Sequence, residues 1–225
     1  MSAYDDARWR PQFISFLQRT MDGDTAHGLD HVQRVVVNAR RIGRDEDADP
    51  AIYLPAAWLH DCVAVSKAHP ERARASTLAA AAATAFLQEA GYPAHTIPAI
   101  AHAIEAHSFS AGIAPRTLEA RVVQDADRLE ALGAIGIARC LMVGEKLGRR
   151  LYDPADPFCT RRAPDDGRFT IDHFYAKLLK LPALLQTASG RQAAAARAHF
   201  LTQFLQQLAQ ELGPAEPTAD VSAAP

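Results

Sequence analysis

The hydrophobic positions of this chain repeat mostly at the spacing of an α-helix. The clearest stripe consists of Val32, Val35, Val36, Ala39 and Ile42, which follow one face of a helix. Alanine is abundant, and clusters of β-branched residues are few. The pattern therefore predicts an all-α fold. Its helices are expected at about residues 8–21, 30–44, 51–63, 72–90, 94–107, 117–140, 171–187 and 190–212.

Turn-forming residues separate these expected helices. Asp49-Pro50 is typical of an N-cap followed by a first-turn proline, and Gly91-Tyr92-Pro93 is typical of a helix stop. The proline-rich segment 149–168 is predicted to be a long loop, and a loop of this length can cover a functional site. We expect one helical domain over residues 1–212. Residues 213–225 lack apolar periodicity, so they are expected to form a disordered tail.

The composition limits the classes of function. Lys and Arg number 24 against 26 Asp and Glu, for a net charge of −2 and a pI near 6.5, which argues against a nucleic-acid partner. The three cysteines include no Cys-x-x-Cys pair, and this fits a reducing compartment. The N-terminus is polar, and no apolar run is long enough to span a membrane. We therefore expect a cytoplasmic protein with no membrane contact.

The stretch AAWLHDCVAV, residues 56–65, places His60 and Asp61 inside an apolar run. Buried titratable groups are costly unless they are paired, shifted in pKa or bound to a cation. Neighbours on a helix point about 100° apart, so both side chains reach one ion most easily at a helix end. Alternatively, His60 could bond a backbone carbonyl while Asp61 caps the next turn. The dipeptide alone does not decide between these interpretations.

The stretch HGLDHVQRV, residues 27–35, offers further nitrogen ligands. His31 opens a helix whose apolar stripe includes Val35, so its imidazole is expected at the edge of the core. His27 lies four residues earlier, but Gly28 intervenes and Asp30 has the character of an N-cap. We therefore interpret His27 as a group that either supports the metal ligands from outside or faces the substrate, rather than as a ligand that binds the metal directly.

The stretch VVQDADRLEALGAIGIAR, residues 122–139, contains two aspartates that a helix would direct to different sides. Asp125 has Arg121 and Arg128 at ion-pairing distance along the helix, so a surface ion pair would explain it. Asp127 has Val123 and Ala131 at the corresponding positions. Asp127 is therefore the better candidate for a metal ligand. The glycines and alanines of this stretch favour close backbone packing.

The order of these residues, and the blocks around them, resemble the HD-domain superfamily of metal-dependent phosphohydrolases, specifically a bacterial branch of small single-domain enzymes. The similar blocks are HGLDHVQRV, LHDCVAVSK, EAHSFS, TLEARVVQDADRLEALGAIGIAR and HFYAKLLKLPALLQTASGR. The resemblance implies a compact helical HD-domain bundle. It also implies that His31, His60, Asp61 and Asp127 bind the metal. Arg128 matches a basic position that can approach a substrate phosphate, and the alternative is a pair with Asp125.

The sequence departs from some family members, which have a glutamate soon after the HD pair as a general acid. Lys67 and His107 are our candidates to contact phosphate or to protonate a leaving group. Lys67 could equally be a solvated loop lysine. His102 and His107 lie five residues apart and cannot share one helical face, although some relatives bind a second metal with histidines in this region.

Two imidazoles and two carboxylates suit one divalent ion, with Mn²⁺ favoured and Mg²⁺, Fe²⁺ or Zn²⁺ as alternatives. Asp61 could hold this ion and also orient the attacking water. Lys67 is the other catalytic candidate, as a group that contacts phosphate oxygens or protonates the leaving group. The resemblance favours a nucleoside or deoxynucleoside triphosphate, cleaved to the monophosphate and pyrophosphate. A nucleotidase, a phosphodiesterase or a non-catalytic nucleotide-binding protein are the alternatives. An aromatic side chain near His107 could contact the base, whereas Trp58, Phe109, Phe174 and Tyr175 are read mainly as core or pocket wall.

Overall fold

The computed structural model describes residues 4–20, 28–63 and 74–213. Within these ranges every regular element is an α- or 3-10 helix, and an isolated bridge joins Arg150 to Phe169. The expected all-α fold is therefore confirmed. No helix in the described segments has the length and apolar character that a transmembrane span needs.

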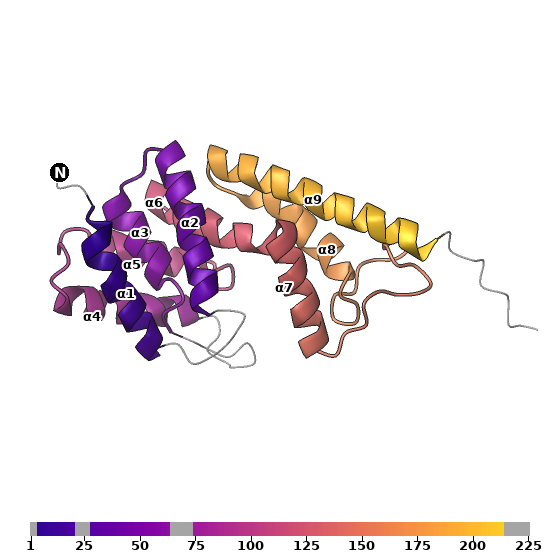
Figure 1. Cartoon of the computed structure of the whole chain (residues 1–225), viewed down its shortest axis with the longest axis horizontal. Helices are drawn as coiled ribbons and strands as arrows, with labels where there is room; N and C mark the ends of the chain where they lie inside the picture. The colour runs from indigo at the N-terminus through magenta and orange to yellow at the C-terminus, as the bar shows by residue number, and fades with distance from the viewer. Residues whose placement is uncertain (1–3, 21–27, 64–73, 214–225) are drawn as a thin grey trace, which may run out of the picture. The chain divides into compact units, whose positions relative to one another are not determined.

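The described chain separates into two compact units. The first contains the residues up to Glu130 together with Leu184–Ala193, and the second contains Ala131–Ala183 together with the residues from Ala194 onward. The helices that lie wholly in the first unit are α1 (Asp6–Thr20), α2 (Leu29–Asp45), α3 (Pro50–Leu59), α4 (Ala75–Glu89), α5 (Ile97–His107) and α6 (Leu118–Arg128) (Figure 1). Helix α2 packs on α3 and α6, and α5 packs on α3, α4 and α6. The four helices α2, α3, α5 and α6 therefore surround the core of this unit.

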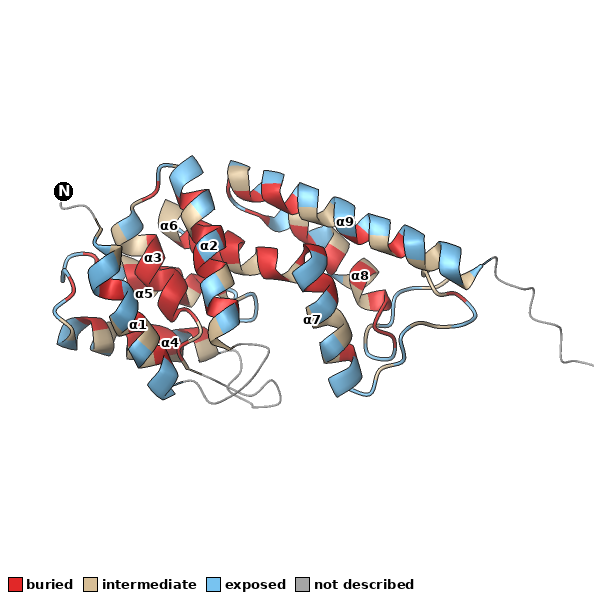
Figure 2. Ribbon diagram, in the orientation of Figure 1, coloured by how far each residue is buried: buried red, intermediate tan, exposed pale blue. Residues whose placement is uncertain are grey.

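Helix α2 buries the stripe that the sequence predicts. Val32, Val35, Ala39 and Ile42 are fully buried, and each large side chain removed from water contributes about 1.5–3 kcal/mol to folding. The red inner face and pale blue outer face of α2 make this polarity visible (Figure 2). The expected N-cap at Asp30 is wrong. The N-cap is the extended Gly28, two residues earlier, and Asp30 lies in the first turn of the helix, where its carboxylate interacts favourably with the helix dipole.

Helix α3 begins as predicted and ends earlier than predicted. The Asp49 side chain accepts a hydrogen bond of 2.9 Å from the Ala51 backbone N–H, and Pro50 occupies the first turn. The helix ends at Leu59 rather than near residue 63, and His60 is its C-cap. The HD pair therefore lies at a helix end, where neighbouring residues can turn toward one point. Helix α4 also ends as expected, with Gly91 at φ 71°.

The predicted helix over residues 117–140 is broken into three pieces. Helix α6 is followed by a 3-10 turn, η2 (Leu129–Ala131), and then by α7 (Gly133–Lys146). Leu132 is extended, and Gly133 has a φ of 69°, which glycine adopts at little cost. A Cβ on Gly136 would lie 2.4 Å from the Ala131 carbonyl oxygen, so only glycine admits this turn of backbone. The glycines thus permit a break as well as close packing.

The predicted helix over residues 171–187 is also broken. Helix α8 (Asp172–Ala176) ends at Lys177, whose backbone leaves the helical region, and a 3-10 segment, η3 (Leu178–Leu184), follows it. Pro182 lies inside this segment and lacks the N–H that a continuous α-helix would use. The last helix, α9 (Ala188–Leu212), matches its prediction closely.

The segment 149–168 is a loop, as predicted, and lies in the second unit. Its conformation is fixed by two buried aspartates. Asp172 at the start of α8 forms a two-pronged ion pair with Arg162, and Asp156 accepts hydrogen bonds from the backbone of Thr160 and Arg161. The loop is not helical, so these side chains provide partners for polar groups that would otherwise lack them.

Candidate metal centre

The predicted ligands of the first unit come from three helices and meet at their ends. His31 lies in the first turn of α2, His60 caps the C-terminus of α3 with Asp61 next to it, and Asp127 lies in the last turn of α6. Helix ends can direct side chains toward a shared point without crossing the helix–helix contacts that bury the apolar stripes. The structure therefore brings together four residues that are separated by up to 96 positions in sequence.

The converging atoms are the two imidazole Nε2 atoms and one oxygen of each carboxylate. His31 Nε2 lies 3.4 Å from His60 Nε2, 3.4 Å from Asp127 Oδ1 and 3.9 Å from Asp61 Oδ2. His60 Nε2 lies 3.7 Å from Asp61 Oδ2 and 4.0 Å from Asp127 Oδ1. Atoms that bind one ion at about 2.0–2.4 Å have separations of this size.

His107, at the end of α5, joins the same cluster. Its Nε2 lies 3.5 Å from Asp61 Oδ1, so Asp61 faces His107 with one oxygen and His31 and His60 with the other. The sequence suggested a substrate-facing role for His107 but gave no reason to expect this contact. His31, His60 and Asp127 form one group able to hold a metal ion, and His60, Asp61 and His107 form a second.

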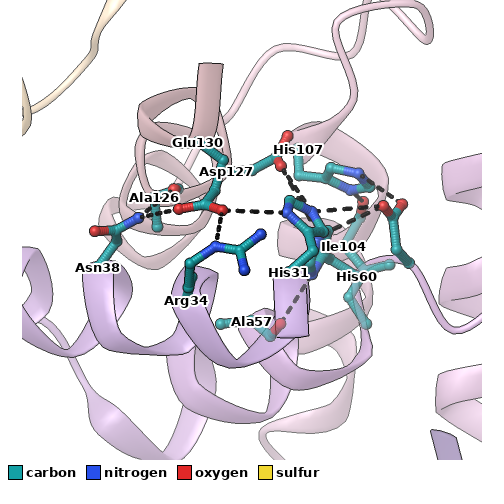
Figure 3. Close-up of polar contacts among 11 residues, drawn as sticks. His31, Arg34, Asn38, Ala57, His60, Ile104, His107, Ala126, Asp127 and Glu130 are labelled. Carbon is teal, nitrogen blue, oxygen red and sulfur yellow. Dashed lines mark hydrogen bonds and ion pairs between the residues drawn. The ribbon is translucent and has the colours of Figure 1, made fainter. Parts of the chain in front are cut away.

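The remaining ring nitrogens explain why the Nε2 atoms are available. His60 Nδ1 donates to the Ala57 carbonyl at 2.8 Å, and His107 Nδ1 donates to the Ile104 carbonyl at 2.6 Å (Figure 3). A proton on Nδ1 leaves a lone pair on Nε2 of a neutral imidazole. Imidazole lone pairs and carboxylate oxygens then face one another, and a positive group between them, either a proton or a metal ion, would relieve their repulsion. The donor set therefore fits a divalent cation.

Exposure and charge divide the cluster into a buried half and an accessible half. The side chains of His31 and His60 are 2% and 0% exposed, whereas those of Asp61 and Asp127 are 24% and 29% exposed. Burial lowers the pKa of His60 to about 4, so this ring is neutral at physiological pH. Burial opposes ionisation of Asp127, but the surrounding imidazoles more than offset it and hold its pKa below the usual value. The two carboxylates therefore lie on the side of the cluster that a cation can reach from solvent.

Asp125 points away from this cluster. It is fully buried and accepts hydrogen bonds from the backbone N–H groups of Gln186 and Thr187 at 2.7–3.0 Å, and from the Thr187 hydroxyl at 2.7 Å. Burial raises its pKa, and the hydrogen bonds offset this only in part. The suggested surface ion pair is therefore not what Asp125 does. It joins α6 to the segment that leads into α9.

Arg128 lies next to Asp127, and its guanidinium Nη1 donates to the Leu184 carbonyl at 2.6 Å. The same guanidinium lies 6.0 Å from the ring centre of Phe109, which is 65% exposed. Phe109, two residues after His107 in the sequence, is therefore a surface aromatic, unlike the buried Trp58 and Phe174. His102 lies apart from the cluster and accepts from the Arg116 backbone N–H.

Two predicted substrate residues, His27 and Lys67, lie outside the described residues, as does most of the segment between α3 and α4. One important residue was missed. Glu130 is 2% exposed, accepts from Arg34 Nε at 2.7 Å and from Asn38 Nδ2 at 3.3 Å, and lies 3.6 Å from His31 Nδ1. Burial raises its pKa, but His31 and Arg34 outweigh this and lower it, so Glu130 remains charged. The sequence did contain a signal for Glu130, because it follows Asp127 by three residues, and this spacing brings two side chains close together on a helix.

Comparisons with known proteins identify the family of this chain. The family model of the HD domain matches residues 28–132. The uncharacterized protein YpgQ of Bacillus subtilis (strain 168) is 32% identical over 195 residues, which cover 85% of this chain and 87% of YpgQ.

Solved structures extend the likeness over nearly the whole chain. The structure of Bacillus subtilis YpgQ in complex with ADP is 27% identical, has a TM-score of 0.66, and covers 92% of this chain and 98% of that one. An HD-superfamily hydrolase from Bacillus thuringiensis is 30% identical, with a TM-score of 0.71 over the same shares of both chains. The resemblance seen in the sequence is thereby confirmed, and this chain belongs to the HD-domain superfamily.

Proposed function

We propose that this HD-superfamily protein is a divalent-metal-dependent phosphohydrolase that acts on nucleotides, with a nucleoside or deoxynucleoside triphosphate as substrate and a monophosphate and pyrophosphate as products. The observation that carries the proposal is the convergence of His31, His60, Asp61 and Asp127. Their donor atoms approach one another at 3.4–4.0 Å with Nε2 lone pairs directed inward. A single ion, with Mn²⁺ favoured, is the simplest group that satisfies them.

In this proposal the four residues would hold the ion, and the bound ion would supply Lewis-acid chemistry toward a phosphoryl oxygen and water. Asp61 is placed for a second role because its two oxygens face different neighbours. The oxygen beside His107 can accept a proton from water and orient it toward phosphorus. His107, whose pKa is raised by Asp61 in spite of its burial, can contact a phosphate oxygen or protonate the leaving group.

Arg128 is proposed to offset charge on the phosphate oxygens, together with His27 and Lys67 from the segments outside the described residues. A guanidinium binds phosphate with several donors at once. Arg128 Nη1 donates a hydrogen bond to the Leu184 carbonyl, which holds the guanidinium in place. Its Nε is buried and has no hydrogen-bond partner among the described residues. Burial lowers the pKa of Arg128, and the charges of Asp125 and Asp127 partly offset this effect.

The nucleotide part of the proposal has two supports. The related YpgQ was crystallised with ADP, a nucleoside diphosphate. In this chain the exposed Phe109 ring lies beside the Arg128 guanidinium, so an aromatic face and a phosphate-binding charge are next to each other. A nucleotide offers a base to the first and phosphates to the second.

The test is an assay of purified protein loaded with Mn²⁺ against nucleoside mono-, di-, tri- and cyclic phosphates, with products resolved by chromatography. The proposal predicts release of pyrophosphate and monophosphate from triphosphates, and loss of turnover after removal of metal with a chelator. Hydrolysis of monophosphates or cyclic phosphates alone would favour the nucleotidase or phosphodiesterase alternative. Nucleotide binding without any turnover would favour a non-catalytic binding protein and overturn the proposed activity.

A further inference from the structure

The three imidazoles of the cluster are oriented in two different ways. His60 and His107 stand at the C-terminal ends of α3 and α5, and each donates its Nδ1 proton to the carbonyl three residues earlier. His31 lies in the first turn of α2, so no earlier turn of this helix offers such a carbonyl. The Gly28 carbonyl already accepts from the backbone N–H groups of His31 and Val32. His31 therefore needs an acceptor from elsewhere in the fold.

Glu130 stands where that acceptor is needed. Its Oε2 lies 3.6 Å from His31 Nδ1 and accepts from Arg34 Nε at 2.7 Å, while Oε1 accepts from Asn38 Nδ2 at 3.3 Å (Figure 3). Asn38 is itself held by the Ala126 carbonyl at 3.2 Å. Both oxygens of Glu130 are thus fixed by α2 side chains spaced three and seven residues after His31.

The burial of Glu130 calls for an explanation. An isolated buried carboxylate is strongly destabilising, and even a buried ion pair is often no more stable than apolar residues of the same size. Arg34 lies at the surface end of the arrangement, with 38% of its side chain exposed, so it could pair with a surface carboxylate at less cost. The approach of Glu130 to His31 Nδ1 offers an explanation for why this carboxylate is buried.

We propose that Glu130 is a positioning residue of the metal centre, which fixes the orientation and tautomer of His31 so that its Nε2 faces the cation. The inference rests on the proposed function, because it needs His31 as a ligand. Metal-binding histidines commonly donate their other N–H to a carboxylate or carbonyl, and loss of that partner weakens metal binding by about 10–100-fold. Arg34 and Asn38 act one step further out, since they hold Glu130 in place.

The test measures Mn²⁺ binding to the full chain from the electron paramagnetic resonance signal of free Mn²⁺. Glu130→Gln keeps the size of the side chain and removes its charge, and we expect the dissociation constant for Mn²⁺ to rise about 10–100-fold. Turnover should recover at high Mn²⁺. Asp125→Asn is the matched control, because it removes another buried carboxylate from the same region but one that contacts Gln186 and Thr187. Its dissociation constant should equal that of the wild type.

A double-mutant cycle shows whether Glu130 acts through His31. In a His31→Ala background, Glu130→Gln should change Mn²⁺ binding by less than about twofold. A wild-type dissociation constant for Glu130→Gln would overturn the inference, and so would a full loss that persists without His31. If Glu130→Gln does not fold, Glu130→Asp carries the test, because it keeps the charge but withdraws the oxygen from Nδ1. Absence of Mn²⁺ binding in the wild type would instead overturn the proposed function itself.

Discussion

Two sides of helix α6 carry the same type of residue in opposite roles. Asp127 faces three imidazoles and is 29% exposed, whereas Asp125, two positions earlier, is fully buried against the backbone of Gln186 and Thr187. The imidazoles lower the pKa of Asp127, and burial raises the pKa of Asp125. One carboxylate is therefore kept charged and faces imidazoles that could bind a metal ion with it, which prepares a binding site. The other has its hydrogen bonds satisfied internally, which stabilises the fold.

Asp127→Asn should have the largest effect on activity. The amide keeps the shape of the side chain but loses the charge that would hold a divalent ion, so we expect turnover to fall by at least about 10³-fold. The melting temperature of the metal-free protein should fall only modestly, because the imidazoles that lower the pKa of Asp127 make its charged form stabilising in the folded state. Activity and thermal melting, measured on the same preparation, test both statements. Retained activity would exclude Asp127 as a ligand.

Asp125→Asn should show the reverse behaviour. One amide NH₂ would face a backbone N–H that now donates to the carboxylate, and we expect a loss of about 1–3 kcal/mol in the free energy of unfolding. Activity per folded molecule and Mn²⁺ affinity should remain near those of the wild type. Urea unfolding together with assays well below the melting temperature would separate the two effects. A variant that is stable but inactive would mean that the two sides of α6 are not independent.

Gly190→Ala tests the structural role of Asp125 through the segment that Asp125 contacts. A Cβ at this position would lie 2.5 Å from both Asp125 Oδ2 and Thr187 Oγ1, so the hydrogen-bonded segment must shift. We expect a destabilisation of about 1–3 kcal/mol without loss of metal binding. Ser189→Ala is a neighbouring control that leaves the Asp125 contact intact and removes a hydrogen bond to Glu46. Equal stability of Gly190→Ala and the wild type would contradict the close approach.

Phe109→Ala should have the smallest effect, and on substrate binding alone. Loss of an exposed aromatic face is expected to raise KM by about 2–10-fold, which corresponds to about 0.5–1.5 kcal/mol of ring contact, while kcat changes little. Phe109→Trp should keep KM low because it retains a ring. Steady-state kinetics with a triphosphate that the wild type hydrolyses would measure both. An unchanged KM for the alanine variant would remove Phe109 from the substrate contacts.

Much of the fold could be predicted because local signals determine it. The apolar stripe of α2, the Asp49 N-cap and the Gly91 stop are each readable from a few neighbouring residues, and the structure contains all three. The breaks within 117–140 and 171–187 could not be predicted in the same way. Gly133 and Gly136 were visible, but whether glycine packs a helix or ends it depends on the backbone that approaches it.

The candidate site shows the same division. Its histidines and aspartates could be selected because titratable residues stand out in apolar or helical patterns, and the structure places His31, His60, Asp61 and Asp127 together. The contacts of Asp125, the approach of His107 to Asp61 and the burial of Glu130 depend on how separate helices pack. Pairings between residues up to 96 positions apart leave no local trace in one sequence.

The most direct test of the account is a crystal structure of the Mn²⁺-loaded protein with an anomalous difference map for manganese. The account predicts a peak within about 2.0–2.4 Å of His31 Nε2, His60 Nε2 and one oxygen each of Asp61 and Asp127. A peak bound by other residues, or no peak at an Mn²⁺ concentration that saturates activity, would contradict it.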